Sequence, residues 1–311
     1  NSALVSAILP NRLTVIESYT FFNCHSLVSI TLPDALTTIK DHAFQWCESL
    51  PSITFPNTLL SIAKMAFFEC IGLSGELVLP SSLQNIGSFC FYGCSGLSGV
   101  LTLPESLIGL GEHCFSSCSG LTGVAFPENL SSIPQYAFST CTNLSGELII
   151  PNHCTSIGYE AFAHCSNLSS LTLGSSVLTI ECGAFKDCTT LETIHCNTPA
   201  LPYSAPPQSN PVEFGSYPVF YHVPTDIPVY VSCLAINQFQ TSVHWSHFTN
   251  MQGVFIGAPS LTVEVNDPVF GTAEVVSIPE DCDHPTATVR ARAENALRES
   301  GIDVRLDAAN L

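Results

Sequence analysis

The stretch Ala43-Phe44-Gln45-Trp46-Cys47-Glu48-Ser49-Leu50 decides the fold, because its skeleton Phe-x-x-Cys-x-x-Leu recurs along the chain. Successive copies are separated by 23 or 24 residues. A fixed period in this range is typical of solenoids, in which each repeat forms one coil that stacks on the next. The eight copies have their cysteines at Cys24, Cys47, Cys70, Cys94, Cys118, Cys141, Cys165 and Cys188.

Each repeat also carries a short apolar–polar–apolar triplet that ends at a turn residue, as in Ile30-Thr31-Leu32-Pro33. This alternation predicts a short strand closed by a turn. A second apolar pair follows, such as Leu36 and Ile39, and the repeat phenylalanine comes five residues later. We therefore expect three apolar corners in each coil and three continuous ladders inside the stack. Three repeats have one extra residue before the strand, beside Gly75, Gly99 and Gly146, where a bulge tolerates an insertion.

The joined pattern Leu-x-x-Ile-x-Leu-Pro and Leu-x-x-Ile-x-x-x-Ala-Phe-x-x-Cys resembles the BspA-like class of leucine-rich repeats. The segments Ile39–Phe44 and Ile157–Phe162 are close matches, whereas Cys90 and Cys114 replace the usual alanine. The resemblance covers residues 4–197. It implies a leucine-rich repeat solenoid with short parallel strands on one face and helical or irregular turns on the other. It also implies an extracellular or cell-surface bacterial protein that adheres to host matrix or plasma proteins or to other cells.

We expect the chain to have three parts. Residues 1–197 form the solenoid, and because Asn1 aligns with the interior of a repeat, we expect the array to continue upstream. Residues 198–253 resemble the segment that closes such arrays, with Trp245 and Phe248 suited to covering an apolar end face. Residues 254–311 contain alternating segments at 261–265, 273–276 and 288–293, which predict strands. They are similar to the opening of an internalin B-repeat module, so we expect a partial β-rich module.

The charge distribution argues against several classes of partner. The formal net charge is −18, and only 11% of the residues are charged. No Lys or Arg lies between Lys64 and Lys186, while eight Glu fall in that interval. A body without cations cannot neutralise phosphates, which argues against nucleic acid and against an anionic membrane surface. Direct membrane insertion is not expected either, because the sequence has no apolar run of about 18 residues.

The fifteen cysteines raise the questions of disulfides and of metal. The odd total, and the fixed place in the repeat that eight of the cysteines occupy, favour buried thiols that pack as small apolar groups. The pairs Cys90/Cys94 and Cys114/Cys118 have a spacing that suits one face of a helical turn, but a zinc site needs further ligands and packing explains them. His244 and His247 have a spacing that can ligate metal, while Trp245 between them explains the motif as a cap anchor. We therefore predict no metal and no cofactor.

No catalytic motif is present. The sequence contains no Gly-rich phosphate loop, no His-Glu-x-x-His helix and no Gly-x-Ser-x-Gly elbow. Carboxylates occur singly, about one per coil, which does not favour a pair for acid–base catalysis. We assign no catalytic residues and predict that the chain is not an enzyme.

The remaining candidate is a surface. Strand side chains alternate, so the middle residue of each triplet faces outward, and eight strands roughly 4.8 Å apart form a ribbon about 34 Å long. Repeat proteins bind partners with such faces, although the same residues also fit a generic strand surface. We predict a non-enzymatic scaffold that binds a protein or glycan of a host or bacterial surface; the alternatives are a carbohydrate-contacting accessory module and a structural stalk. The candidate binding residues are Thr31, Thr54, Val78, Thr102, Ala125, Ile149, Thr172 and His195.

Overall fold

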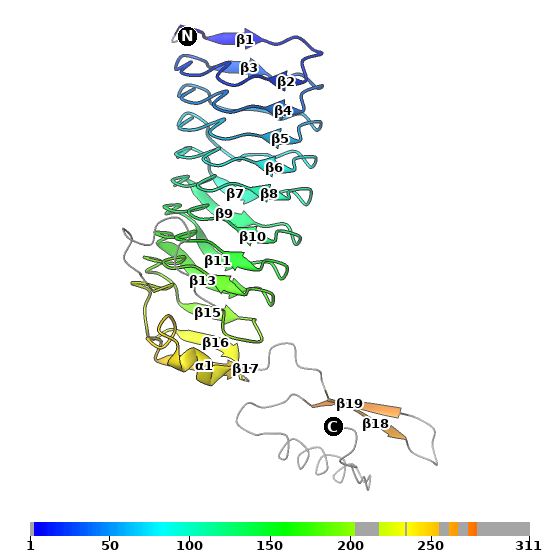
Figure 1. Ribbon diagram of the computed structural model, residues 1–311, viewed down its shortest axis with the longest axis vertical. Helices are drawn as coiled ribbons and strands as arrows, with labels where there is room; N and C mark the ends of the chain where they lie inside the picture. The colour runs from blue at the N-terminus through cyan, green and yellow to red at the C-terminus, as the bar shows by residue number, and fades with distance from the viewer. Residues whose placement is uncertain (1–2, 203–217, 234, 255–260, 267–272, 279–311) are drawn as a thin grey trace.

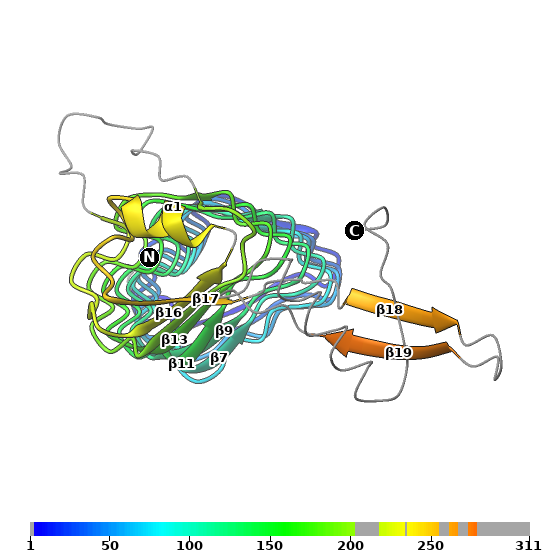
Figure 2. The same ribbon diagram turned by 90° about the horizontal axis from the view of Figure 1, so that it is seen from below.

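The computed structural model describes residues 3–202, 218–233, 235–254, 261–266 and 273–278. Within residues 3–254, the described chain forms a parallel β-solenoid whose coils stack along one axis (Figure 1). Viewed along that axis, the coils superimpose and the longer strands lie along one side (Figure 2). The expected leucine-rich repeat solenoid is therefore confirmed.

The longer strands form the strand face, and all of their pairings are parallel. Ile30 pairs in register with Ala7 of the preceding coil, and Leu171 pairs with both Leu148 and Ile194. The apolar members of the triplets thus stack on one another inside the solenoid. The strands of this face are β1 (Ser6–Ile8), β3 (Ser29–Thr31), β7 (Gly99–Thr102), β9 (Leu121–Ala125), β11 (Ser145–Ile149), β13 (Asn167–Leu173), β15 (Thr193–Cys196), β16 (Pro228–Ser232) and β17 (Asn250–Val254).

Two of the eight predicted strands are absent from this face, because residues 53–55 and 77–79 adopt no strand. Pro51 precedes the first of these segments and has no N–H to donate to the coil before it. Before the second, Gly75 has a φ of 76° and makes only an isolated bridge with Leu97. Both triplets still turn their apolar residues inward, since Phe55, Leu77 and Leu79 are buried.

A second row of two-residue strands, which the sequence analysis did not predict, ends at the second member of each second apolar pair, such as Ile39. Neighbouring strands of this row pair parallel within two sheets, as Ile39 does with Ile62. The sheets have the orders β2-β4-β5-β6-β8 and β10-β12-β14. The strands are β2 (Val15–Ile16), β4 (Thr38–Ile39), β5 (Ser61–Ile62), β6 (Asn85–Ile86), β8 (Gly109–Leu110), β10 (Ser132–Ile133), β12 (Ser156–Ile157) and β14 (Thr179–Ile180).

The third side of each coil, here called the turn face, is a six-residue turn around the motif Ala-Phe. Two residues of the turn have left-handed backbone, such as His42 (φ 57°) and Trp46 (φ 62°). This geometry points alternate N–H groups at the next coil, so that the Phe44 N–H donates to the Ala66 carbonyl at 2.7 Å. The turn face is therefore irregular rather than helical, and hydrogen bonds join the coils here as well.

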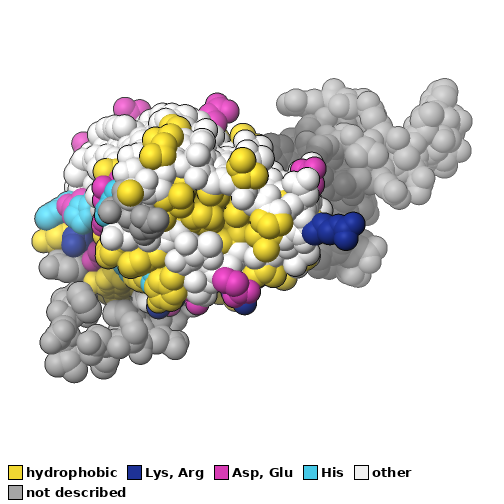
Figure 3. All heavy atoms as spheres, turned by 90° about the horizontal axis from the view of Figure 1, so that it is seen from above, with side chains coloured by type: hydrophobic (Ala, Val, Ile, Leu, Met, Phe, Trp, Pro, Cys, Tyr) yellow, Lys and Arg dark blue, Asp and Glu magenta, His cyan; other side chains and the backbone are white. Residues whose placement is uncertain are grey.

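The core consists of stacked side chains of the same type. The repeat phenylalanines form a ladder whose successive ring centroids are 5.0–5.6 Å apart, from Phe21 to Phe185 and on to Phe220. From Phe44 to Phe185 these rings are completely buried. Seen from the N-terminal end, hydrophobic side chains gather in the middle of the coil and acidic side chains lie at its rim (Figure 3).

The segment after the eighth repeat continues the same stack. Val219 accepts a hydrogen bond from the Phe185 N–H, and Phe220 adds a ninth ring to the ladder. Strands β16 and β17 extend the strand face, and helix α1 (Ile236–Thr241) lies beside them (Figure 1). Trp245 is 1% exposed and packs edge-on against both Phe220 and Phe239.

Beyond the solenoid, β18 (Leu261–Asn266) and β19 (Ala273–Ile278) pair antiparallel. These two strands coincide with two of the three alternating segments recognised in the sequence. The third segment, residues 288–293, and Cys282 lie outside the described residues.

Candidate functional site

The eight candidate residues form one row along the strand face. Six of them are exposed, and they include Val78 at 74% and Ile149 at 55% exposure. Thr172 and His195 are half-buried: the Thr172 hydroxyl donates to Glu147 at 2.7 Å, and the His195 ring stacks on Tyr230 with the centroids 4.7 Å apart. The structure thus brings the predicted residues onto one face, and their role in binding stays a prediction.

The strand register lengthens this row beyond the eight predicted positions. Ile8 pairs with Thr31 at one end, and Tyr230 pairs with His195 and then Gln252 at the other. The sequence analysis missed Tyr230 because it lies outside the periodic region. The sequence feature that could have revealed Tyr230 is the alternating segment Pro228–Ser232, which has the triplet pattern of a repeat strand.

A second row of outward side chains runs two residues before the first, and three coils depart from its pattern. Most members are Ser, Thr or Gly, such as Ser29, Gly123 and Ser170. In the three coils that carry an insertion, the members are Glu76, Val100 and Glu147. The preceding Gly75, Gly99 and Gly146 have φ of 76°, 79° and 70°, and the ladder shifts register after Gly99 and after Gly146. Bulges of this kind re-aim the side chain that follows.

The turn face carries an aromatic row that the sequence analysis left unassigned. Phe89, His113 and Tyr136 stack with successive centroids 4.3 Å apart. Beside them Phe68 stacks on Tyr92 at 4.9 Å. The sequence pattern could have revealed this row, because Phe89, His113 and Tyr136 lie two positions before a repeat phenylalanine, and Phe68 and Tyr92 lie one position after one. The row also includes Tyr19, Phe22, His42 and Trp46 in the first two coils.

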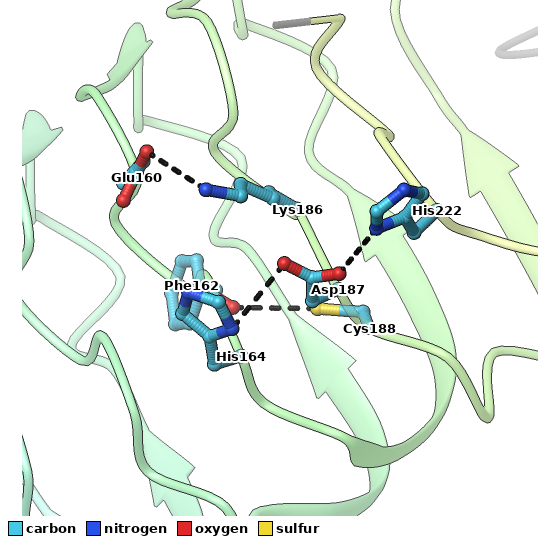
Figure 4. Close-up of polar contacts among 7 residues, drawn as sticks. All are labelled: Glu160, Phe162, His164, Lys186, Asp187, Cys188 and His222. Atoms are coloured by element: carbon cyan, nitrogen blue, oxygen red, sulfur yellow. Dashed lines mark hydrogen bonds and ion pairs between the residues drawn. The ribbon is translucent and has the colours of Figure 1, made fainter. Parts of the chain in front are cut away.

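Farther along the turn face, the aromatic side chains give way to a charged cluster (Figure 4). Asp187 lies between two imidazoles, with His222 Nδ1 at 2.7 Å and His164 Nδ1 at 3.3 Å. Lys186 and Glu160 form an ion pair at 3.6 Å. The cluster joins the last two repeats to the segment that follows them. Because its imidazoles are about half exposed, its contribution to stability is small.

The repeat cysteines have a common contact inside the solenoid. Each thiol from Cys47 to Cys188 donates to the carbonyl of the phenylalanine one coil earlier, as Cys118 does to Phe91 at 3.1 Å. Burial raises the pKa of the Cys94 thiol to about 12, so it is protonated at neutral pH. The described cysteines are free thiols, and all of them except Cys233 are buried. Packing thus accounts for both Cys90/Cys94 and Cys114/Cys118.

The histidines and cysteines considered as possible metal ligands do not come together into a metal site within the described part of the chain. Among the described residues no set of three or more His, Cys, Asp or Glu side chains is arranged to hold a metal ion. Burial lowers the pKa of His244 and of His247, which flank the buried Trp245. A shallow hollow of about 250 Å³ lies over β5, β6 and β8, and its lining includes Gly87, Gly109 and Gly111. Within the described part of the chain, no helix has the length and apolarity needed to cross a bilayer.

Comparison with known proteins identifies the family. The family model described as "BspA type Leucine rich repeat region" matches six copies, over residues 1–100 and 74–192. The chain belongs to this BspA-type leucine-rich repeat family. The match confirms the resemblance seen in the sequence, and it ends near the last periodic cysteine, Cys188. No curated protein matches the chain.

Solved structures of bacterial leucine-rich repeat proteins are similar to this BspA-type chain. A leucine-rich repeat protein of T. pallidum is 28% identical, over 60% of this chain and 78% of that one, with a TM-score of 0.46. One from Bacteroides ovatus is 21% identical, over 81% and 73%, also with a TM-score of 0.46. A leucine-rich cell surface protein of Faecalibacterium prausnitzii is 21% identical, over 62% and 79%, with a TM-score of 0.38.

Proposed function

We propose that this BspA-type chain is a non-enzymatic binding scaffold that recognises a macromolecule along its strand face. The observation that carries the proposal is the row from Thr31 to His195, which presents one side chain per coil. Its strands pair in parallel at Ile8 with Thr31, at Thr102 with Ala125, and from Ile149 through Thr172 and His195 to Tyr230. Repeat proteins bind partners through extended faces of this kind. The partner is a protein or a glycan on a host or bacterial surface, such as a matrix protein or another cell.

The chemistry of the strand face favours recognition over catalysis. Its side chains are mainly hydroxyl and aliphatic groups, which offer hydrogen bonds and apolar contact to a partner. The described repeat thiols, which are strong potential nucleophiles when ionised, are buried, and burial raises the pKa of Cys94 to about 12. We also propose that the protein acts outside the cell or on its surface, and its membership of the BspA-type family supports this location.

A specific observation favours one alternative, the carbohydrate-contacting accessory module. The aromatic row on the turn face presents half-buried rings in successive coils, including Phe68, Tyr92 and Tyr136. Aromatic rings pack against the apolar faces of sugars as they do against other apolar groups. Trp46 lies in this row and Trp245 is buried, so a change of tryptophan fluorescence on adding a glycan would report binding at the turn face.

The experiment that tests the leading proposal compares two surfaces of the full chain. Thr54→Lys with Thr102→Lys places two cations on the strand face; Gln84→Lys with Ser131→Lys adds the same charge at exposed positions outside it. We expect attachment to matrix-coated surfaces or to cells to fall in the first variant and to persist in the second. Equal attachment by the two variants would contradict strand-face recognition and favour a structural stalk.

A further inference from the structure

The three coils with an insertion make one part of the strand face chemically different from the rest. They contribute Glu76 with Val78, Val100, and Glu147 with Ile149, all of which are exposed. The three aliphatic side chains are 74%, 56% and 55% exposed in the order Val78, Val100, Ile149. We call these five residues the bulged-coil patch. Elsewhere in the eight repeats, both outward rows carry only Ser, Thr, Gly, Ala and His.

The large side chains of the patch lean over the next coil in the same direction. A Cβ added at Gly99 would lie 2.8 Å from Cγ of Glu76, and one added at Gly123 would lie 3.2 Å from Cγ2 of Val100. Glu147 accepts the hydrogen bond from Thr172 across the same interval. Glycines and a short hydroxyl therefore leave room for these side chains, and the hydrogen bond from Thr172 holds the Glu147 carboxylate.

The two carboxylates of the patch have no cationic partner. Neither Glu76 nor Glu147 forms an ion pair with a described residue, and the interval between Lys64 and Lys186 contains no Lys or Arg. The carboxylates lie three coils apart, or about 14 Å at the usual strand spacing. Exposed aliphatic side chains lie between and beside them. A surface of this kind complements a chain that carries positive charges at its ends and apolar groups between them.

We propose that the bulged-coil patch binds an extended cationic polypeptide segment. This inference rests on the proposed function of the strand face and specifies the partner's chemistry. The segment lies along the solenoid axis, across the strands. Because an extended chain advances about 3.3 Å per residue, two Lys or Arg four positions apart span roughly the distance between Glu76 and Glu147. Small apolar residues between them pack on Val78, Val100 and Ile149.

The test uses the full chain and a fluorescent peptide with two lysines four positions apart and Val and Ser between them. We expect fluorescence polarisation to show binding that weakens as salt is added, since exposed charge pairs are screened. Glu76→Gln with Glu147→Gln should weaken binding roughly tenfold. Glu105→Gln with Glu128→Gln removes the same charge at exposed positions outside the patch and should leave the affinity within about twofold of the parent value.

A charge reversal gives a second, independent readout. Glu76→Lys with Glu147→Lys should lose the lysine peptide and gain a peptide of the same sequence with glutamates in place of the lysines. All the substituted positions are exposed, and an unchanged melting temperature will verify that each variant folds. Equal weakening by the control pair would overturn the proposal, because the net charge would then explain the attraction. Absence of binding by the parent chain would overturn it too, as would salt-insensitive binding of a neutral glycan at the patch.

Failure of the bulged-coil patch proposal can be distinguished from failure of the proposed function. Suppose that the Glu76→Gln, Glu147→Gln variant attaches to surfaces like the parent and the Thr54→Lys, Thr102→Lys variant does not. The proposal that the bulged-coil patch binds a cationic segment is then wrong, whereas the proposal of strand-face recognition is supported. If neither variant changes attachment, both proposals fail.

Discussion

At the scale of single residues, the repeat cysteine has two functions in the core. Its sulfur fills a small apolar space, and its S–H satisfies the carbonyl of the phenylalanine one coil earlier, as from Cys141 to Phe115 at 3.1 Å. That carbonyl also accepts the N–H of the cysteine three residues later, such as Cys118. A buried carbonyl thereby gains a second donor in a place that water cannot reach. The sequence analysis predicted the burial of the thiol and missed the hydrogen bond, because spacing alone does not reveal which way a thiol points.

His113 makes the stability of the solenoid depend on pH. Its ring is stacked between Phe89 and Tyr136, its Nδ1 is buried without a hydrogen-bond partner among the described residues, and burial lowers its pKa despite the neighbouring Glu112. The folded state therefore disfavours the imidazolium, whereas the unfolded chain takes up the proton below about pH 6.5. The free energy of unfolding should fall as the pH drops from neutral through this range.

The substitution His113→Phe tests this dependence. A phenyl ring preserves the stack and cannot titrate, so the drop in melting temperature between pH 7.5 and pH 5.5 should be smaller than in the parent. Some pH dependence will remain, because burial also lowers the pKa of His244 and of His247. The exposed His153, changed to Asn, provides the control and should show the parent's full drop. An identical drop in the His113→Phe variant would contradict the assignment.

At the scale of elements, the coils approach one another closely where glycine follows a two-residue strand. Gly158 comes directly after β12, and a Cβ at this position would lie 2.5 Å from the backbone nitrogen of Gln135 in the preceding coil. Gly123 in β9 differs, because an added Cβ would first meet the side chain of Val100 at 3.2 Å. Backbone cannot move aside as a side chain does, so the two glycines should respond differently to a methyl group.

We expect Gly158→Ala to destabilise the protein by about 1–3 kcal/mol through overpacking. Gly123→Ala should change the free energy of unfolding by less than about 1 kcal/mol, because Val100 can rotate and alanine restricts the unfolded chain. Urea denaturation measures both values. Similar losses in the two variants would indicate that the closeness of the coils at Gly158 does not limit the packing.

The elements also show where prediction from sequence ends. Period and alternation were sufficient for the coils and for the inward residues, because every coil repeats the same contacts. They did not reveal that Pro51 would prevent a strand at 53–55, since the lost donor matters only beside a neighbouring coil. Two-residue strands such as β5 are too short to have a periodicity. The ninth ring, Phe220, was missed because the chain leaves the fixed period before it returns to the stack.

At the scale of the whole molecule, each coil of the solenoid is stabilised by its own contacts and by its contacts with the two neighbouring coils. Its described C-terminal end is covered by aromatic rings: Trp245 and Phe248 contact Phe220, which itself stacks on Phe185. The strand-face sheet continues through β15, β16 and β17, so this end also receives backbone hydrogen bonds. The binding surface that we propose therefore lies on a scaffold whose order near the C-terminal end depends on this aromatic cover.

The substitution Trp245→Ala tests that dependence. Because Trp245 is 1% exposed, its truncation should cost about 3–5 kcal/mol locally. In a stack coupled only between neighbours, the loss should spread from the cap into the nearest coils and fade with distance. Hydrogen exchange should accelerate at Phe185 and Phe162 and remain near the parent rate at Phe67 and Phe44. Uniform acceleration along the chain would mean that the solenoid unfolds as one cooperative unit, and the cap would then stabilise the strand face over its full length.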